Sequence, residues 1–316
     1  DFLSAEAVRS AYEKEKPAHN PNLEYTQTRY ENDPFRPEYH PIPQSGWTNE
    51  PHGFVYHQGR YHFFYQKTAQ PYKLFMNWGH ISSPNLVQWE DQQPVLWPEH
   101  SYDTKGIWSG TALVDKNDTP AIMYTGVDFV RAHMSLAYGN DSLDQWNKYE
   151  ANPVVAQGPE GYQDFRDPYI WKENDIWYMI VGSGIYETGT VVLYTSRDLK
   201  NWEFQGRLYR GREDAGEVGT FWEMPVFLKF DDPYVLLVNT LPHAHTIYWT
   251  GQFENNEFIP DSHEPEKLEI INTSLAPMVT TDEHGRKVGI NIIFAPPQEL
   301  TDDPAAHKEW GWANVF

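Results

Sequence analysis

Short apolar segments separated by polar turns run along most of the chain and predict β-hairpins. After Glu50-Pro51, one apolar segment is followed by a turn around Gly59 and by a second apolar segment that ends at Tyr65. The same pattern begins at Asp167 and at Glu223. Segments of this length, with Gly, Asn and Asp in the turns, are typical of antiparallel strands. The sequence therefore predicts three similar hairpins, each preceded by a carboxylate.

Two more hairpins of this kind lack the carboxylate and start at Ser109 and Ala276. The five equivalent positions, 50, 109, 167, 223 and 276, are 59, 58, 56 and 53 residues apart. A second repeat runs from a Ser to Trp89, Trp146 and Trp202. Five similar all-β units predict a five-bladed β-propeller with a central funnel-shaped active site.

The domain organisation follows from where these repeats begin. Residues 1–37 are predicted to form an N-terminal extension with a short helix over Ser4–Lys16. Residues 38–316 are predicted to form the propeller, with Gly311–Phe316 as its last strand.

The repeat brings three carboxylates together. Equivalent positions of successive blades lie at one height around the axis, so Glu50, Asp167 and Glu223 are expected to point into the channel. Three carboxylates close together repel one another, so we expect them to serve a function such as metal binding or glycoside hydrolysis. Arg166 is placed to hold Asp167 ionised and to bind sugar hydroxyls. A purely structural role at strand starts remains the alternative, and three copies in register favour the pocket.

The charge balance narrows the class of partner. The chain has 45 Asp and Glu against 24 Lys and Arg, a net charge of -21. This argues against nucleic acid and against an anionic membrane surface. No apolar stretch approaches the ~18 residues of a membrane span. The absence of Cys excludes disulfides and thiolate metal sites, and 13 Trp and 20 Tyr fit both sheet packing and a sugar site.

Several ordered segments resemble the motifs of glycoside hydrolase family 32, which contains the invertases, inulinases and levanases. Trp47-Thr-Asn-Glu-Pro-His-Gly53 resembles the family's W-M-N-D-P-N-G, and Phe165-Arg-Asp-Pro168 resembles its R-D-P. Phe221-Trp-Glu-Met-Pro225 resembles its W-E-C-P. The remaining matches are Phe64-Tyr-Gln66, Met76-Asn-Trp-Gly-His80 and Trp108-Ser-Gly110.

The resemblance implies a retaining glycosidase that acts on β-D-fructofuranosides such as sucrose, fructo-oligosaccharides, inulin or levan. Glu50 would take the nucleophile position, Glu223 would be the acid/base, and Asp167 would bind fructose hydroxyls and stabilise the transition state. The residues that match the fructose subsite are Asn49, Gln66, Trp78, Trp108, Ser109 and Arg166.

No cofactor or metal is needed for this chemistry, and the partner would be a small or polymeric fructoside. An extracellular or periplasmic location is favoured, with the cytoplasm and the oligomeric state left open. The β-sandwich that usually follows the propeller in this family is not expected in this chain.

The sequence departs from the family motif at the position of the nucleophile. The family has Asp where this chain has Glu50, which is longer by one methylene, and His52 replaces an asparagine. A misplacement of about 1 Å can cost on the order of 100-fold in rate. Three alternatives therefore stay open: a fructosyltransferase, a non-catalytic fructan-binding propeller, and an inverting arabinan-type five-bladed hydrolase. Carboxyl separations of about 5–5.5 Å favour retention and about 6.5–9.5 Å favour inversion.

Overall fold

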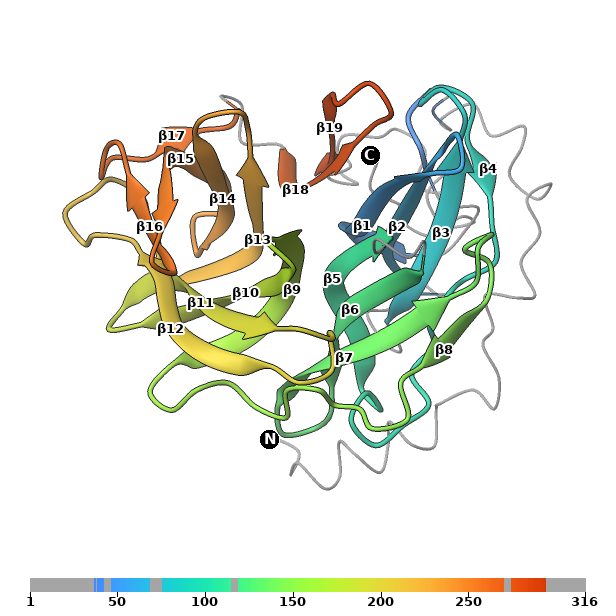
Figure 1. Cartoon of the computed structure of the whole chain (residues 1–316), viewed down its shortest axis with the longest axis horizontal. Helices are drawn as coiled ribbons and strands as arrows, with labels where there is room; N and C mark the ends of the chain where they lie inside the picture. The colour runs from blue at the N-terminus through green and yellow to red at the C-terminus, as the bar shows by residue number, and fades with distance from the viewer. Residues whose placement is uncertain are drawn as a thin grey trace, which may run out of the picture.

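The computed structural model describes residues 37, 39–42, 47–68, 76–114, 119–269 and 274–293. All regular elements in these ranges are β-strands, arranged in sheets around a common centre (Figure 1). Within them, no helix has the length and apolar character that crossing a membrane would require. The predicted helix at Ser4–Lys16 and the predicted last strand at Gly311–Phe316 lie outside the described residues.

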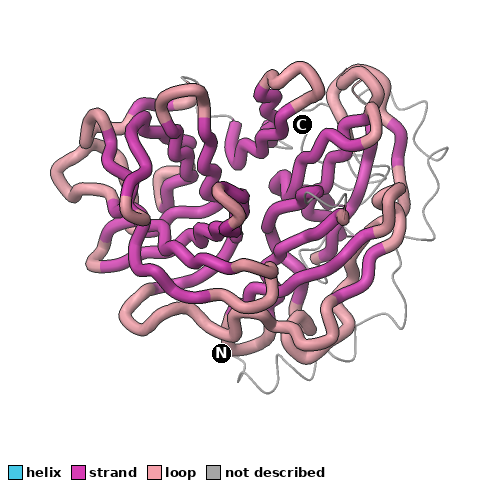
Figure 2. The backbone as a smooth tube through the Cα atoms, viewed as in Figure 1, coloured by secondary structure: helices cyan, strands magenta, loops and turns pink. Residues whose placement is uncertain are grey.

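Four blades of four or five antiparallel strands make up most of the fold (Figure 2). The first contains β1 (Trp47–His57), β2 (Arg60–Thr68), β3 (Asn77–Ser83) and β4 (Glu90–Asp91). The second contains β5 (Gly106–Val114), β6 (Pro120–Val127), β7 (Ala132–Gly139) and β8 (Trp146–Lys148). The third contains β9 (Gln163–Glu173), β10 (Ile176–Ile185), β11 (Thr188–Ser196) and β12 (Glu203–Arg210). The fourth contains β13 (Phe221–Lys229), β14 (Tyr234–Leu241), β15 (His245–Glu254), β16 (Glu257–Pro260) and β17 (Glu266–Lys267).

A two-stranded sheet, β18 (Ser274–Thr281) with β19 (Lys287–Ile293), stands between the fourth and first blades. The first strands follow one another around the axis: β1 contacts β5, β5 contacts β9, β9 contacts β13, and β13 contacts β18, which contacts β1. The five predicted hairpins are confirmed as β1–β2, β5–β6, β9–β10, β13–β14 and β18–β19. The all-β propeller is therefore confirmed, with four blades of four or more strands in the described residues.

The core lies in apolar clusters between neighbouring sheets rather than in one central mass. Between the third and fourth blades, the fully buried Trp222 packs against Tyr209 and Trp249, with ring centroids 6.0 and 5.2 Å away. Gly182 lets the two blades approach, because a β-carbon there would lie 2.3 Å from the Trp222 carbonyl oxygen. Many of the aromatic residues therefore hold blades together.

The second sequence repeat forms the turn before the last strand in three blades. The side chains of Trp89, Trp146 and Trp202 each donate the indole N–H to the carbonyl of the Leu three residues earlier, at 3.2, 3.0 and 2.8 Å. That Leu has a left-handed backbone in each turn, with φ of 66°, 59° and 65°. The regular spacing of these Trp thus records a repeated turn rather than a sugar site.

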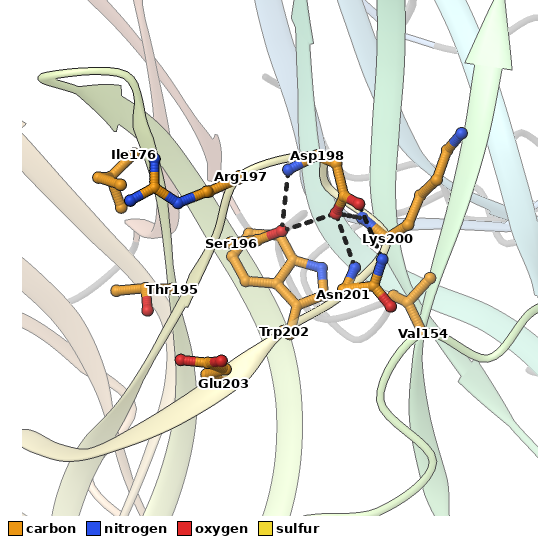
Figure 3. Close-up of a pocket in the computed structure, with 10 residues that line it drawn as sticks. All are labelled: Val154, Ile176, Thr195, Ser196, Arg197, Asp198, Lys200, Asn201, Trp202 and Glu203. Carbon is orange, nitrogen blue, oxygen red and sulfur yellow. Dashed lines mark hydrogen bonds between the residues drawn. The ribbon is translucent and has the colours of Figure 1, made fainter.

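Figure 3 shows the turn of the third blade, which borders a cavity of about 500 Å³. The Asp198 carboxylate accepts the backbone N–H groups of Lys200 and Asn201 and the Asn201 amide. Burial acts to raise the pKa of Asp198, but these hydrogen bonds outweigh it and lower the pKa to about 2. The Asp198 carboxylate therefore stabilises this turn.

A register shift near the start of each first strand bends the backbone at the predicted equivalent positions. In three of these strands Asp167, Met224 (one residue after the predicted Glu223) and Ala276 have φ of 64°, 48° and 54°. Their backbone N–H groups donate to the preceding sheet: to Thr125 Oγ1 at 2.9 Å, Asp167 Oδ2 at 3.1 Å and Asn239 Oδ1 at 3.0 Å. Such bulges redirect side chains, and here they also tie successive sheets together.

We expect Thr125→Val to lower the free energy of unfolding by about 1–3 kcal/mol, because it leaves the buried Asp167 N–H without its acceptor. Urea unfolding measures the change. Thr195→Val is the matched control, since its hydroxyl accepts a hydrogen bond from Gln205 near the surface. Equal losses in the two variants would show that the inter-sheet hydrogen bond has no special role.

Candidate active site

A pocket of about 250 Å³ lies where β1, β5, β9 and β13 converge. The three predicted carboxylates meet in it, although they are up to 173 positions apart in the chain (50 to 223). Each comes from the bulged part of a first strand. The lining residues are Asn49, Glu50, Gln66, Met76, Trp108, Ser109, Arg166, Asp167 and Glu223.

Arg166 is the cation of the pocket and connects two of the carboxylates. Its Nη2 and Nε donate to Glu223 Oε1 at 2.7 and 3.2 Å, and its Nε lies 3.9 Å from Asp167 Oδ2. The guanidinium also lies over the Phe221 ring, 4.0 Å from its centroid. Burial acts to lower the pKa of Arg166, but Asp167 and Glu223 outweigh burial and raise it. Arg166 therefore stays charged and is held from several sides.

Glu50 occupies the most strongly perturbed position. Burial, followed by the charges of Glu223 and Asp167, raises its pKa from 4.5 to about 8. A hydrogen bond from Ser109 Oγ to Glu50 Oε2, 3.3 Å long, opposes this rise, as does Arg166. The Glu50 carboxyl is therefore mainly protonated at neutral pH.

Asp167 is buried and shares this electrostatic environment. Burial raises its pKa to about 7, and the Glu223 charge adds to the rise, although Arg166 and the Met224 N–H act in the opposite direction. Arg166 acts to lower the pKa of Asp167, in the expected direction, but it hydrogen-bonds Glu223, and burial together with the Glu223 charge outweighs its effect on Asp167. The three carboxyl groups consequently do not all carry a charge at neutral pH.

The structure separates the predicted subsite residues into two groups. Five of them line the pocket: Asn49, Gln66, Trp108, Ser109 and Arg166. Trp78 does not; its ring is fully buried and its indole N–H donates to the Trp108 carbonyl at 2.9 Å. Trp78 thus supports the strand that carries Trp108.

Met76 lines the pocket although no role was predicted for it. Its only signal in the sequence was its place at the start of a segment that matched a family motif.

His52 lies behind the pocket rather than in it. Its ring is fully buried, 4.9 Å from Trp78, and neither ring nitrogen has a hydrogen-bond partner in the described part of the chain. Burial lowers the pKa of His52 well below its usual value, so the ring is neutral. The residue that departs from the family motif therefore packs next to Trp78 behind the pocket.

The pocket has the elements of acid–base chemistry. A carboxyl that its surroundings keep protonated lies beside a second carboxyl that accepts two hydrogen bonds from Arg166. Two titratable groups in different environments are typical of catalytic acid and base pairs. No group of three or more His, Cys, Asp or Glu side chains in the described ranges is arranged to hold a metal ion.

Comparison with known families and proteins identifies sequences that are similar to this chain. The family model of the glycosyl hydrolases family 32 N-terminal domain matches residues 40–315. A levanase of Bacillus subtilis is 38% identical over 212 residues, covering 62% of this chain and 29% of the levanase. A sucrose-6-phosphate hydrolase of Escherichia coli is 30% identical over 304 residues, covering 89% of this chain and 61% of that protein. The chain thus spans less than two thirds of the length of these curated relatives.

Solved structures agree with this match. Fructan 1-exohydrolase IIa from Cichorium intybus has a TM-score of 0.78 at 28% identity, covering 89% of this chain and 57% of that one. A β-fructofuranosidase from Bombyx mori has a TM-score of 0.75 at 30% identity, covering 99% of this chain and 65% of that one. The arrangement of strands around the pocket is therefore shared with these proteins.

We expect Glu50→Gln to stabilise the protein increasingly as the pH rises. Since the folded-state pKa of Glu50 is about 8 and its ordinary value is 4.5, its contribution to stability is largest below pH 4.5 and is lost as the pH approaches 8. Gln cannot ionise, so the variant gains on the order of 1–3 kcal/mol relative to the parent at pH 8. Urea unfolding at acidic and alkaline pH measures this gain, with the exposed Glu203→Gln as control. A pH-independent difference would contradict the shift.

Proposed function

Because the chain belongs to glycosyl hydrolase family 32, we propose that it cleaves β-D-fructofuranosides by a retaining double displacement. The observation that carries the proposal is the convergence of Glu50, Asp167 and Glu223 with Arg166 in one pocket. These residues occupy the positions of the family motifs. Relatives named levanase and raffinose invertase support fructans and sucrose-type sugars as the substrate class.

In the first step Glu223 donates a proton to the glycosidic oxygen while the Glu50 carboxylate attacks the anomeric carbon of fructose. The C–O bond to the leaving sugar breaks, and a covalent fructosyl ester forms on Glu50. In the second step Glu223 takes a proton from a water molecule whose oxygen attacks the same carbon. The ester bond to Glu50 breaks, so the Glu50 carboxylate is regenerated and fructose leaves with its configuration retained. Asp167 and Arg166 would hold the fructose hydroxyls.

The protonation of Glu50 sets a condition on this mechanism. Attack requires the ionised carboxylate, whereas the pKa of Glu50 is about 8. The step also requires Glu223 to carry a proton, whereas in the free protein Glu50 is the protonated group and Glu223 accepts two hydrogen bonds from Arg166. The proton must therefore pass from Glu50 to Glu223 when the fructoside binds, and the rate should follow a bell-shaped dependence on pH. The Ser109 hydroxyl favours the ionised form, since it donates to Glu50 Oε2. Fructosyl transfer would use the same first step, with a sugar hydroxyl replacing water in the second.

We also propose that the β18–β19 hairpin is the inner half of a fifth blade in a propeller spanning residues 38–316. Two observations support this. Strand β18 contacts both β13 and β1, which closes the ring of first strands. Ala276 has the same left-handed backbone and inter-sheet hydrogen bond as Met224 and Asp167.

We expect the parent protein to release fructose from at least one of sucrose, inulin and levan, and Glu223→Gln to lower the rate on that substrate by about 10²–10⁴-fold. The loss should be much smaller on β-D-fructosyl fluoride, because fluoride leaves without a proton from Glu223. Glu50→Gln should lose activity on both substrates, because it removes the nucleophile.

Released fructose and fluoride measure these rates, with the exposed Glu203→Gln as control. Parent and Glu50→Gln proteins that are equally inactive on every substrate would rule out catalysis at this pocket. Equal losses of Glu223→Gln on the sugar and on the fluoride would reject the acid role of Glu223.

We expect Glu50→Asp to lower kcat/KM by about 100-fold, although Asp is the usual residue of the family. The shorter side chain withdraws the carboxylate from Ser109 Oγ, to which Glu50 is hydrogen-bonded at 3.3 Å. Steady-state kinetics on the preferred fructoside measure the change. A gain in activity would show instead that the additional methylene of Glu50 impairs the reaction.

A further inference from the structure

Asn239 places a polar side chain in the interior of β14, where only 3% of the residue is exposed. Its Oδ1 accepts hydrogen bonds from the Ala276 backbone N–H at 3.0 Å and from Thr246 Oγ1 at 2.6 Å. A backbone N–H can only donate, so the atom that it meets must be the amide oxygen. These contacts therefore fix the orientation of the amide and identify the other atom as Nδ2.

The Nδ2 group of Asn239 has no hydrogen-bond partner among the described residues. Buried polar atoms in folded proteins are almost always paired, and Asn is disfavoured within strands. Both observations make this amide an unfavourable choice for stability alone. They indicate that Nδ2 has a role that the free protein does not display.

The equivalent position of the second blade shows that the hydrogen bond between sheets does not require Asn. Thr125 lies opposite Trp108, immediately before the bulge of β5, and its Oγ1 accepts the Asp167 N–H at 2.9 Å. Asn239 lies opposite Glu223, immediately before the bulge of β13, and accepts the corresponding N–H of β18. A hydroxyl is sufficient for that bond, so the Nδ2 group is the feature that Asn adds.

Glu223 is the direct neighbour of Asn239 across the β13–β14 pair. Residues directly opposite each other in such a pair point to one face, with β-carbons about 4.5–5.5 Å apart, so a Glu and an Asn side chain can reach each other. The charged or titratable groups that line the pocket with Glu223 are Arg166 and Asp167 of β9 and Glu50 of β1. Arg166 is the one that donates to Glu223 in the described structure.

The reaction changes which partner suits Glu223. Both hydrogen bonds from Arg166 end on Glu223 Oε1, and a cation favours the ionised carboxylate. The proposed first step requires instead that Glu223 carry a proton and that Arg166 bind fructose hydroxyls. A neutral amide can donate to a protonated carboxyl group and to a carboxylate alike, because both have an oxygen that accepts. An amide beside Glu223 therefore suits both steps.

We propose that Asn239 Nδ2 donates to the Glu223 carboxyl group in the substrate complex. It orients this group while the proton of Glu223 passes to the glycosidic oxygen and is later recovered from water. The inference rests on the proposed function. Asn239 acts through Glu223 rather than on the sugar, so it is a positioning residue, and the donor that is unpartnered in the free protein gains its partner during the reaction.

The variant Asn239→Thr tests the donor separately from the hydrogen bond between sheets. Thr has a hydroxyl that can accept the backbone N–H of β18, as Thr125 does for Asp167, but it has no amide. Values of kcat/KM are compared on the preferred fructoside and on β-D-fructosyl fluoride, because fluoride leaves without a proton from Glu223. The ratio of the two values in one sample does not depend on the fraction of folded protein.

Asn152→Thr is the matched control. The Asn152 amide donates to the Leu136 carbonyl at 2.8 Å in the second blade, and Asn152 is not among the residues that line the catalytic pocket. This variant removes a structural amide of the same kind. It should lower the free energy of unfolding and leave the ratio of the two kcat/KM values unchanged.

We expect Asn239→Thr to lower kcat/KM on the fructoside by about 10- to 100-fold, the range for a lost hydrogen bond to a charged group, and on the fluoride by less than about threefold. Equal losses on the two substrates would overturn the proposal, since a structural defect affects both. An unchanged value on the fructoside, or the same change of ratio in Asn152→Thr, would overturn it as well.

Failure of the proposed function gives a different result. A parent protein that turns over neither the fructosides nor the fluoride would overturn both the reaction and the role of Asn239. A parent protein that is active, with equal losses on the two substrates in Asn239→Thr, would remove only the role of Asn239.

Discussion

A left-handed bend near the start of three first strands, β9, β13 and β18, is the constraint on which fold and pocket both depend. It turns the backbone N–H group of Asp167, Met224 and Ala276 toward the preceding sheet, where a side chain accepts it. Left-handed backbone is costly for residues other than glycine, so these hydrogen bonds offset the strain. In β9 and β13 this bend lies at Asp167 and next to Glu223, whereas β1 positions Glu50 through register shifts without a left-handed residue.

Asp167 shows how closely the architecture and the site are linked. Its backbone N–H is bound by Thr125 of the second blade, and its carboxylate accepts the Met224 N–H of the fourth blade. A residue proposed to bind fructose is thus also part of the connection between three blades. Replacing Asp167 would therefore alter both the position of Glu223 and the pocket itself.

Bringing three carboxyl groups into one pocket is electrostatically unfavourable in a protein that already has a net charge of -21. Three carboxyls share one cation, Arg166, which hydrogen-bonds Glu223. The protein accommodates the remaining charge by raising the pKa of Glu50 and Asp167 through burial and mutual repulsion. A neutral sugar that donates hydroxyl groups suits such a site better than an anion does.

The sequence by itself determined the strands, the repeat and the identity of the clustered carboxylates. Alternation and turn residues are local signals, and equal spacing carries equivalent positions to one axis. Only the tertiary structure decided which group Arg166 binds, that Trp78 supports Trp108 from behind, and that Met76 lines the site. These features depend on the bulges and on how closely neighbouring blades approach. Burial and the charges of Glu223 and Asp167 together raise the pKa of Glu50, so no local pattern records these features.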